Sequence, residues 1–294
     1  NSPIGKTYQQ TNDGALTEGR QIAMTARIVS FNVNGLRSRL DQLEAMIKQH
    51  SPDIIGLQET KVSDEEFPHQ AIADLGYQVN FHGQKGHYGV ALLSKAGAVA
   101  VTRGYPSDEE DAQRRMIHGE YLINGQTVHV INGYFPQGES RAHPTKFPAK
   151  EKFYADLLAY LDSNFNPEDL VAVMGDMNVA ADDIDVGIKP ENAKRWIKTG
   201  KCAFLPEERQ WLQKLLDWGL QDSFREQNAG DNSYSWFDYR SKGFDLEPKR
   251  GLRIDLILAS PSLMKRIADT GIDAEARGFE KPSDHCPIWA DLSL

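Results

Sequence analysis

Polar residues that could bind a phosphate or a metal ion stand at the ends of apolar runs along the whole chain. They are mostly carboxylates and amides, joined by one phenol and one imidazole: Asn32, Asn34, Glu59, Tyr134, Asp176, Asn178, Asp255, Asp284 and His285. Binding and catalytic groups concentrate on the loops and strand ends of a rigid scaffold. The recurrence therefore predicts one site that is assembled from distant parts of the chain.

The segment VMGDMN, residues 173–178, brings a carboxylate and an amide to the end of one apolar run. Asp176 and Asn178 are two residues apart, so an extended chain points both side chains the same way. Gly175 permits close approach of a neighbouring backbone. This arrangement suits a base beside an orienting amide, although an Asx turn that caps a strand would use the same residues.

Three further acidic positions have similar dual interpretations. Glu59 closes the run GLQET and suits Mg²⁺, which takes one or two protein carboxylates plus substrate oxygens, but an ion-paired carboxylate fits the same pattern. Asp284 and His285 share the proline-flanked turn KPSDHCP, where they could hold a metal, stabilise a phosphoryl oxygen or simply face solvent. Asp255 lies inside the apolar run GLRIDLIL and needs a partner, for which His285 is available.

The aromatic segment SYSWFDYRSKGF, residues 233–244, is a candidate substrate surface. Trp236 and Phe237 precede the basic residues Arg240 and Lys242. Exposed aromatic rings beside cations suit nucleic-acid bases and sugars. A strand whose aromatic side chains alternate into the core explains the segment equally well.

Short strand-like runs and amphipathic helical stretches alternate from residue 27 onward and must position these groups. Hydrophobic periodicity predicts helices around 40–47, 153–161 and 207–216. It predicts strands at 28–33, 53–58, 77–81, 89–93, 98–101, 117–123, 127–134, 170–174, 253–258 and 285–292. The middle of the chain is therefore expected to be mostly antiparallel sheet. We expect one catalytic domain over residues 24–294, behind a polar stretch, residues 1–23, that we interpret as a disordered leader or a cloning remnant.

Composition excludes several classes of protein. The 294 residues include 33 basic and 42 acidic side chains, a net charge of −9, and are 40% hydrophobic, which is typical of a folded protein rather than a disordered one. The acidic balance disfavours a non-specific DNA coater. Two cysteines are too few for a disulfide framework, and no membrane-spanning or signal segment is recognisable, so we expect a cytoplasmic protein without membrane contact.

Nine segments of the chain closely resemble the bacterial exonuclease III family and occur in that family's order. They are FNVNGLRSR, DIIGLQETK, HGQKGHYGVALLSK, INGYFPQGESRAHPTKFPAK, VMGDMN, KRWIKTGKC, SWFDYRSKGFD, GLRIDLILAS and EKPSDHCPIW, and the resemblance spans residues 27–294. It also places the chain in the superfamily that includes deoxyribonuclease I and neutral sphingomyelinases. The implied fold is an α/β (α+β) four-layer sandwich, in which two packed mixed β-sheets are flanked by helices.

The resemblance implies a DNA-repair enzyme that depends on Mg²⁺ or Mn²⁺. Such an enzyme removes nucleotides from duplex DNA in the 3′ to 5′ direction, cleaves 5′ to abasic sites, trims blocked 3′ ends and degrades RNA in hybrids. Its partner would be duplex DNA with abasic sites, nicks or blocked 3′ ends. We expect a monomer that associates with the nucleoid when it acts on DNA.

Metal ligands follow from the resemblance residue by residue. Glu59 resembles the main metal carboxylate, with Asn32 and Asp284 beside the metal and with Asp176 and Asn178 as further candidate ligands. Whether one or two metals bind during turnover stays open. Relatives of the eukaryotic branch have Asp where Asn34 stands, which gives a two-metal site less support.

The reacting groups follow in the same way. Asp176 resembles the group that activates or orients the attacking water, and Asn178 helps to position it. Tyr134 is expected to contact the phosphate. His285, which Asp255 would hold in place, is expected to contact the scissile phosphate. Which of Asp176 and His285 handles the proton stays open. These roles meet the needs of phosphodiester hydrolysis, which are an activated water and neutralised phosphoryl oxygens.

Substrate contacts are expected from six residues. Trp236 and Phe237 would line a pocket that accepts an extruded base-free sugar and rejects a normal nucleotide, since extrusion costs least where no base is stacked. Backbone or groove contacts are expected from Lys61, Arg115, Gln137 and Lys146.

Two other functions are compatible with the same scaffold. A phosphodiesterase for a different substrate class would retain the metal and water groups but change the substrate pocket. A non-catalytic nucleic-acid-binding regulator has no need to retain the full set of reacting groups.

Overall fold

The computed structural model describes residues 8–10, 16–18 and 25–294. Within the predicted leader, strands β1 (Tyr8–Gln10) and β2 (Leu16–Glu18) pair in antiparallel fashion. The rest of the stretch 1–23 lies outside the described residues, so its interpretation as a leader or remnant stays a prediction. In the part of the chain that is described, no helix has both the length and the apolar character needed to cross a membrane.

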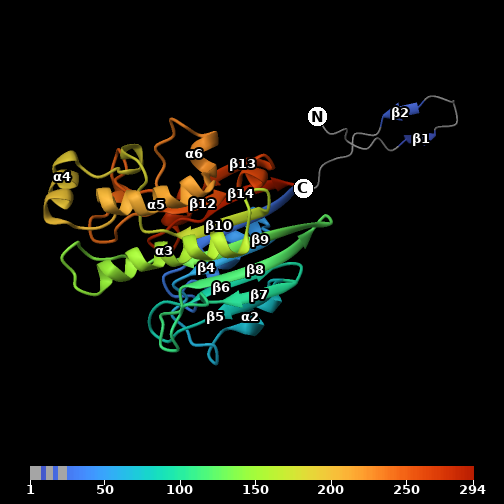
Figure 1. The fold of residues 1–294 in the computed structure, drawn as a ribbon, viewed down its shortest axis with the longest axis horizontal. Coiled ribbons are helices and arrows are strands. Elements are labelled where there is room, and N and C mark those ends of the chain that lie inside the picture. The colour runs from blue at the N-terminus through green and yellow to red at the C-terminus, as the bar shows by residue number, and fades with distance from the viewer. Residues whose placement is uncertain (1–7, 11–15, 19–24) are drawn as a thin grey trace.

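Two six-stranded mixed sheets form the centre of the molecule (Figure 1). The first has the order β11 (Gln221–Asp222), β12 (Asp255–Ala259), β10 (Leu170–Asp176), β9 (Gln126–Tyr134), β8 (Met116–Ile123), β7 (Ala100–Arg103). The second has the order β13 (Ile267–Ile272), β14 (Ile288–Ser293), β3 (Thr25–Asn32), β4 (Ile54–Gln58), β6 (Val90–Ser94), β5 (Gln78–His82). Each sheet contains one parallel pair, β9 with β10 and β3 with β4.

The inner faces of the two sheets pack against each other. Ile28 and Leu92 of the second sheet share one apolar cluster with Val130, Met174 and Ile257 of the first. Every residue of β4, β6 and β12 is buried, as expected for strands that are covered on both faces. This double burial explains why these strands are continuous apolar runs in the sequence.

Helices cover both outer faces. The long helices α3 (Lys146–Asn164) and α5 (Pro206–Trp218) pack on the first sheet, while α1 (Leu40–His50) and α2 (His69–Asp74) pack on the second. The shorter elements are α4 (Pro190–Thr199), α6 (Ser223–Gln227), α7 (Pro261–Met264) and the 3₁₀ turns η1 (Asp183–Asp185), η2 (Gly243–Asp245) and η3 (Ala274–Gly278). The predicted four-layer sandwich is thereby confirmed.

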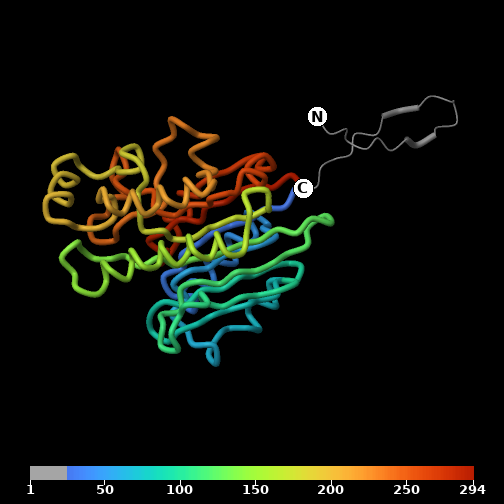
Figure 2. The backbone as a smooth tube through the Cα atoms, viewed as in Figure 1, coloured from blue at the N-terminus to red at the C-terminus, as the bar shows by residue number. Residues whose placement is uncertain are grey.

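The strands β3 and β14 lie side by side within the second sheet. Thr25 of β3 pairs with Ser293 of β14, and Figure 2 shows the C-terminus beside the start of the coloured tube. The chain before β14 therefore returns to β3, which brings residues 283–284 next to residues 32–34.

Most helices and strands were predicted correctly from the sequence, but the distribution of the strands between the two sheets was not. The predicted middle strands are antiparallel, yet β5 and β6 join one sheet and β7, β8 and β9 the other. The short elements α4, α6, β11 and β13 were not predicted. The predicted strand 253–258 begins as β12 at Asp255, and the predicted strand 285–292 begins as β14 at Ile288. Two functional candidates, Asp255 and His285, therefore lie at or before a strand start.

Candidate active site

The parallel strand pairs of both sheets end at one edge of the sandwich. β3 ends at Asn32, and β9 and β10 end at Tyr134 and Asp176, which are paired in register. The backbones of β9 and β10 approach closely here, because a Cβ on Gly175 would lie 1.9 Å from the carbonyl oxygen of Gly133. The sequence-based interpretation of Gly175 as a site of close approach is confirmed.

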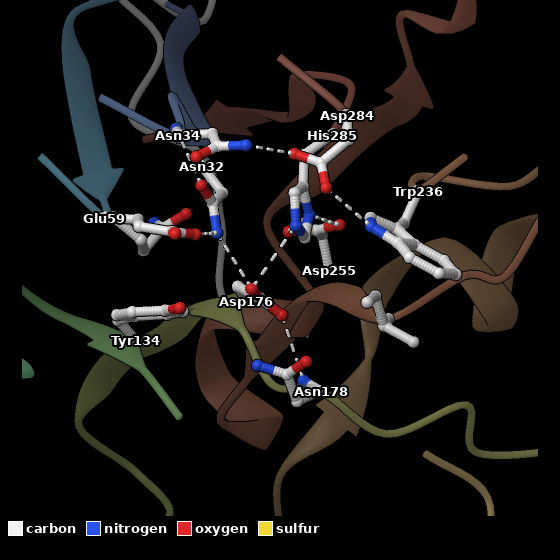
Figure 3. A network of polar contacts seen from close by, with 12 residues as sticks. Asn32, Asn34, Glu59, Tyr134, Asp176, Asn178, Trp236, Asp255, Asp284 and His285 are labelled. Atoms are coloured by element: carbon white, nitrogen blue, oxygen red, sulfur yellow. Dashed lines mark hydrogen bonds and ion pairs between the residues drawn. The ribbon is translucent and has the colours of Figure 1, made fainter. Parts of the chain in front are cut away.

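Asn32 links the two sheets at this edge (Figure 3). Its Nδ2 donates to Asp176 Oδ2 at 2.9 Å and to Glu59 Oε2 at 3.0 Å, while its Oδ1 accepts the backbone N–H of Asn34 at 2.9 Å. The side chain is fully buried and every polar atom of the amide is used. Asn32 therefore fixes the separation of two carboxylates from different sheets.

Four residues of the site have backbone torsions that residues other than glycine rarely adopt. The φ angles of Asn34, Glu59, Lys61 and Asn178 are 44°, 55°, 55° and 53°. Such conformations persist where surrounding contacts enforce them, and they cluster at functional sites. Asn178 is held by two bonds, from its N–H to Asp176 Oδ1 at 3.1 Å and from its Nδ2 to the Phe135 carbonyl at 2.8 Å.

His285 lies between two buried carboxylates. Its Nδ1 is 2.9 Å and 3.1 Å from the two oxygens of Asp255, and its Nε2 faces Asp176 Oδ2 at 3.5 Å. Because an ionised carboxylate only accepts hydrogen bonds, Nδ1 carries a proton and donates it to Asp255. Asp255 and Asp176 are paired across β12 and β10, so the sheet register itself places both acids beside the imidazole.

Burial and mutual charge shift the pKa values of this group. Burial raises the pKa of Asp176 to about 7, with Asp255 and Glu59 adding to the rise and His285 and the hydrogen bond from Asn32 opposing it. Burial alone would lower the pKa of His285, but Asp255 and Asp176 outweigh it and hold that pKa well above the ordinary value. At neutral pH the imidazole is thus a cation, and the Asp176 carboxyl can gain or lose a proton.

Asp284 connects the Glu59 side of the site to the aromatic wall. Its Oδ1 accepts from Asn34 Nδ2 at 2.9 Å, and its Oδ2 accepts from Trp236 Nε1 at 3.0 Å (Figure 3). Lys61 Nζ in turn donates to Asn34 Oδ1 at 2.7 Å and lies 3.2 Å from Glu59 Oε1. A continuous chain of polar contacts therefore runs from Trp236 to Glu59.

Tyr134 stands across the site from Trp236 (Figure 3). Burial, followed by the carboxylates of Glu59 and Asp176, raises the pKa of its hydroxyl well above the usual value, with Arg115 opposing the rise. The phenol is therefore neutral at working pH and is available as a hydrogen-bond donor. Of the four residues expected to contact the DNA backbone or groove, Arg115 lies beside Tyr134. Its guanidinium lies over the rings of Tyr88 and Tyr134 and donates to the Tyr134 carbonyl at 3.0 Å.

The other predicted backbone contacts are spread around the site. Gln137 is exposed and lines the cavity described below, and its Oε1 accepts the backbone N–H of Glu139 at 2.7 Å. Lys146 begins α3 and forms an exposed ion pair with Glu139 at 2.6 Å. Lys61 is turned inward to Asn34 and Glu59, as described above, so it supports the site more directly than a groove contact would.

A cavity of about 800 Å³ opens over these groups. Its floor includes Glu59, Tyr134, Asp176, Asn178, Asp284 and His285. Trp236 forms part of the wall together with Leu252 and Ile254, two residues that the sequence interpretation did not single out. Both belong to the motif GLRIDLIL, in which the sequence indicated only Asp255 as a functional candidate.

The expectation for Phe237 was wrong. The side chain is 1% exposed, does not line the cavity, and packs edge-on against Phe244 with ring centroids 5.3 Å apart. Extended chain points neighbouring side chains to opposite sides, so Trp236 and Phe237 could not both face the cavity. Phe237 thus fits the core interpretation, whereas Trp236 lines the cavity and its contact with substrate stays a prediction.

Most of the basic wall of the cavity was missed by the sequence interpretation, which singled out only Arg240. Five basic side chains line the cavity: Lys189, Arg195, Lys201, Arg240 and Arg250. The helix α4 that carries part of this wall is anchored by Trp196, whose ring stacks on Phe204 at 5.5 Å and lies under Lys201 Nζ at 3.9 Å. The sequence signal was the density of basic residues in KRWIKTGKC.

The floor of the cavity suits a hard divalent cation. Glu59, Asp176 and Asp284 supply carboxylate oxygens, and the amides of Asn32 and Asn178 lie beside them. Glu59 and Asp255 both raise the pKa of Asp176, which shows that negative charge is crowded here and that a cation would relieve it. Among the described residues, Asp176, Asp255 and His285 also have ligand atoms within 4.8 Å of one another. Both oxygens of Asp255 face His285, and Asp255 does not line the cavity, so the carboxylates on the cavity floor are those of Glu59, Asp176 and Asp284.

The sequence matches a known family and a known enzyme over most of its length. The profile of the endonuclease/exonuclease/phosphatase family matches residues 29–285. Exodeoxyribonuclease III of Haemophilus influenzae is 58% identical over 267 residues, which cover 90% of this chain and 99% of that protein.

Two solved structures are similar over nearly the whole chain. An AP endonuclease from Archaeoglobus fulgidus has a TM-score of 0.83 and 36% identity, and the match covers 92% of this chain and all of that one. A 3′ phosphatase from Neisseria, bound to a product DNA hairpin, has a TM-score of 0.82 and 36% identity, with coverage of 92% and 100%. The chain is thus similar over nearly its whole length to enzymes named for their action on nucleic acid.

Proposed function

The chain belongs to the endonuclease/exonuclease/phosphatase family and is a DNA-repair nuclease of its exodeoxyribonuclease III branch, and we propose that Asp176 is its water-activating group. The observation that carries this proposal is the position of Asp176 on the cavity floor, between the amide of Asn32 and the Asp255-bound imidazole of His285. The substrates that we propose are duplex DNA with abasic sites, nicks or blocked 3′ ends. The reactions are 3′ to 5′ nucleotide removal, cleavage 5′ to abasic sites, trimming of 3′ ends and degradation of RNA in hybrids.

Proton transfer follows from the pKa values of the two central groups. His285 is already protonated at neutral pH, so it cannot take a proton from water, whereas Asp176, with a pKa of about 7, can. We therefore assign the base to Asp176 and the orientation of the attacking water to Asn178, which is fixed against it. The protonated imidazole donates a charge-assisted hydrogen bond to a phosphoryl oxygen, and the neutral Tyr134 hydroxyl donates a second one.

A divalent cation, Mg²⁺ or Mn²⁺, is the proposed cofactor. Glu59 would hold it, with Asn32 and Asp284 beside it and with Asp176 and Asn178 as further candidate ligands. When bound, it supplies charge neutralisation for the phosphoryl and leaving oxygens. The carboxylates of Glu59 and Asp284 are kept in place by the bonds from Asn32, Asn34 and Trp236.

Selection of the abasic site is assigned to the wall of the cavity. Trp236, Leu252 and Ile254 offer a firm apolar surface beside the reacting groups. An extruded sugar without a base can lie against this wall, and extrusion costs least where no base is stacked in the duplex. Since the action is on genomic DNA, we also propose that the enzyme works in the cytoplasm, as a monomer with one complete site per chain.

The test is cleavage of a labelled duplex that carries one abasic analogue, with Mg²⁺ or with a chelator, beside an intact duplex with a recessed 3′ end. Metal-dependent incision 5′ to the lesion together with 3′ trimming supports the proposal. Binding without cleavage would instead favour a regulator on the same scaffold. Failure to bind either duplex would favour a phosphodiesterase for another substrate class.

The metal assignment has its own test in Glu59→Gln. The variant keeps the size of the side chain but loses a negative charge, so half-maximal activity should require roughly tenfold more Mg²⁺ or above. A titration of activity against Mg²⁺ measures this shift. An unchanged titration would remove Glu59 from the ligands.

A further inference from the structure

A lysine is completely buried behind the cavity, in a place where no catalytic role has been assigned. Lys150, in the second turn of α3, and Glu208, in the first turn of α5, both have side chains with 0% exposure and form an ion pair. Besides Glu208 Oε1, the ammonium donates to the carbonyl oxygens of Asn178 at 2.7 Å and Gln137 at 3.3 Å. A lysine ammonium has three N–H donors, and each has one acceptor here.

The two carbonyls belong to the segments that carry the site. Asn178 has a left-handed backbone with φ of 53°, and its own N–H is bonded to Asp176 Oδ1. Fixing its carbonyl therefore restrains the backbone of Asn178, which carries both the Asn178 amide side chain and the N–H that is bonded to Asp176. Gln137 follows β9 and lines the cavity.

Helix α3 holds the same segment at a second point. Tyr154, four residues and so one turn after Lys150, donates its hydroxyl hydrogen to the Met177 carbonyl at 2.6 Å. One face of α3 thus contacts two successive carbonyls after the end of β10.

The lysine stem is enclosed as well as its ammonium. A Cβ on Gly138, whose φ is +83°, would lie 3.0 Å from both Lys150 Cδ and Cys202 Sγ. The chain after β9 can pass this close only because residue 138 is a glycine. The positions of Lys150 and of the segment around Gln137 are therefore mutually restricted.

We propose that Lys150 is a positioning residue of the nuclease, which holds the Asn178 and Gln137 carbonyls against α3 and so orients Asp176 and Asn178 toward the attacking water. The inference rests on the roles proposed above for these two residues. Because the bond to Asn178 is the shorter one, the expected effect is on turnover more than on substrate binding.

Stability alone does not account for a lysine at this position. A buried ion pair recovers its desolvation cost only with excellent geometry, and apolar residues of similar volume often serve equally well. An apolar side chain cannot donate hydrogen bonds to the two backbone carbonyls. An experiment is therefore needed to distinguish a structural role of Lys150 from a positioning role.

Two matched variants separate these roles. Glu208→Gln breaks the ion pair but leaves Lys150 able to donate to both carbonyls, so its melting temperature should fall while kcat stays within about twofold. Lys150→Met combined with Glu208→Gln removes the charge and the donors together, while the Gln side chain can still accept the Leu205 N–H that Glu208 accepts at 2.9 Å. In this double variant kcat should fall by roughly ten- to a hundredfold with KM within about threefold, the scale of a small misplacement of reacting groups.

The measurement is kcat and KM on the abasic duplex at saturating Mg²⁺, with melting temperatures for each protein. Equal kcat values for the two variants would overturn the proposal and make Lys150 a structural residue. Leu215→Ala, on the buried face of α5, controls for loss of stability as such, and its kcat should not change. Asp176→Asn, assayed in parallel, identifies the other failure: if it retains activity, the proposed role of Asp176 is wrong whatever the lysine does.

Discussion

Two buried histidines in this protein, His285 at the site and His118 beneath α3, differ in the partners that surround them. Both have little exposure, 4% and 9%. His285 has Asp255 on one nitrogen and Asp176 on the other side, and its pKa is raised. His118 contacts the Tyr160 hydroxyl at 2.8 Å and His129 at 3.1 Å, and burial followed by the charge of His129 lowers its pKa to about 4.

The contrast shows what turns a buried imidazole into a reacting group. Burial opposes the charged form in both cases, so burial alone yields a neutral and inert ring. Two carboxylates reverse the outcome at His285, and the same proximity raises the pKa of Asp176 above that of an ordinary carboxyl. The active site is thus distinguished by which charges are buried together, not by how deeply they are buried.

The strongest test of this contrast is Asp176→Asn, which removes the proposed base with almost no change of shape. We expect kcat to fall by about a hundredfold or more, the usual contribution of a positioned acid or base. Steady-state cleavage of the abasic duplex measures it, with circular dichroism to verify the fold. The matched control, Tyr160→Phe beside His118, should retain full activity. Near wild-type turnover of Asp176→Asn would dismiss the assignment.

A second test removes a negative charge beside His285, so that its surroundings resemble those of His118. In Asp255→Asn the imidazole loses its main negative neighbour while its burial stays, so its pKa should drop. We expect a roughly tenfold or larger loss of kcat at neutral pH, because a neutral ring donates a weaker hydrogen bond to the phosphate. NMR titration of the His285 ring would report the pKa directly. An unshifted titration would mean that Asp176 alone holds the charge.

Trp236→Ala sharpens the contrast between the floor of the cavity and its wall. Loss of the indole should reduce abasic-site incision roughly tenfold relative to 3′ trimming, the scale of a lost pocket contact. Because Trp236 Nε1 also bonds Asp284, Trp236→Phe serves as the control that removes this bond but keeps an aromatic wall. If both variants lose abasic-site incision and 3′ trimming in equal proportion, the indole acts through its hydrogen bond to Asp284 and not through contact with the sugar.

The smallest effect is expected at His118 and concerns stability alone. Its pKa of about 4 in the folded protein lies below the ordinary value near 6.5, so between these pH values the unfolded chain binds more protons. The contribution of His118 to the free energy of unfolding is therefore fully present above about pH 6.5. It is lost as the pH falls toward 4, by about 3 kcal/mol at most.

The variant His118→Gln should remove this dependence. Its loss of melting temperature between pH 7.5 and pH 5 should be smaller than that of the parent protein by roughly 4 °C. Nuclease activity at pH 7.5 should be unchanged. An identical loss in both proteins would show that His118 is protonated in the fold.

Sequence reasoning recovered the fold class and identified polar residues that the structure brings together, but it missed part of the architecture. The polar residues at strand ends, such as Asn32 and Asp176, could be found because each interrupts or closes an apolar run. Their proximity could be expected because binding and catalytic groups concentrate at the strand ends of a rigid scaffold. The distribution of the middle strands between two sheets could not, since local periodicity does not encode which sheet a strand joins.

Individual side-chain directions were the other limit. Trp236 and Phe237 are adjacent and chemically similar, and only tertiary packing decides which one meets the cavity. Leu252 and Ile254 look like ordinary core residues in sequence, although they line the pocket wall. Lys150 gave no signal, because a lysine on a helix is normally solvated and its burial depends on Glu208, 58 residues away.

The basic wall of the cavity also determines how this protein meets its substrate. The chain as a whole carries a net charge of −9, so most of its surface repels a polyanion at long range. Lys189, Arg195, Lys201, Arg240 and Arg250 make the mouth of the cavity a locally attractive face. Attraction to DNA is therefore expected to come mainly from this one face, and contact with intact duplex through the rest of the surface is expected to be weak.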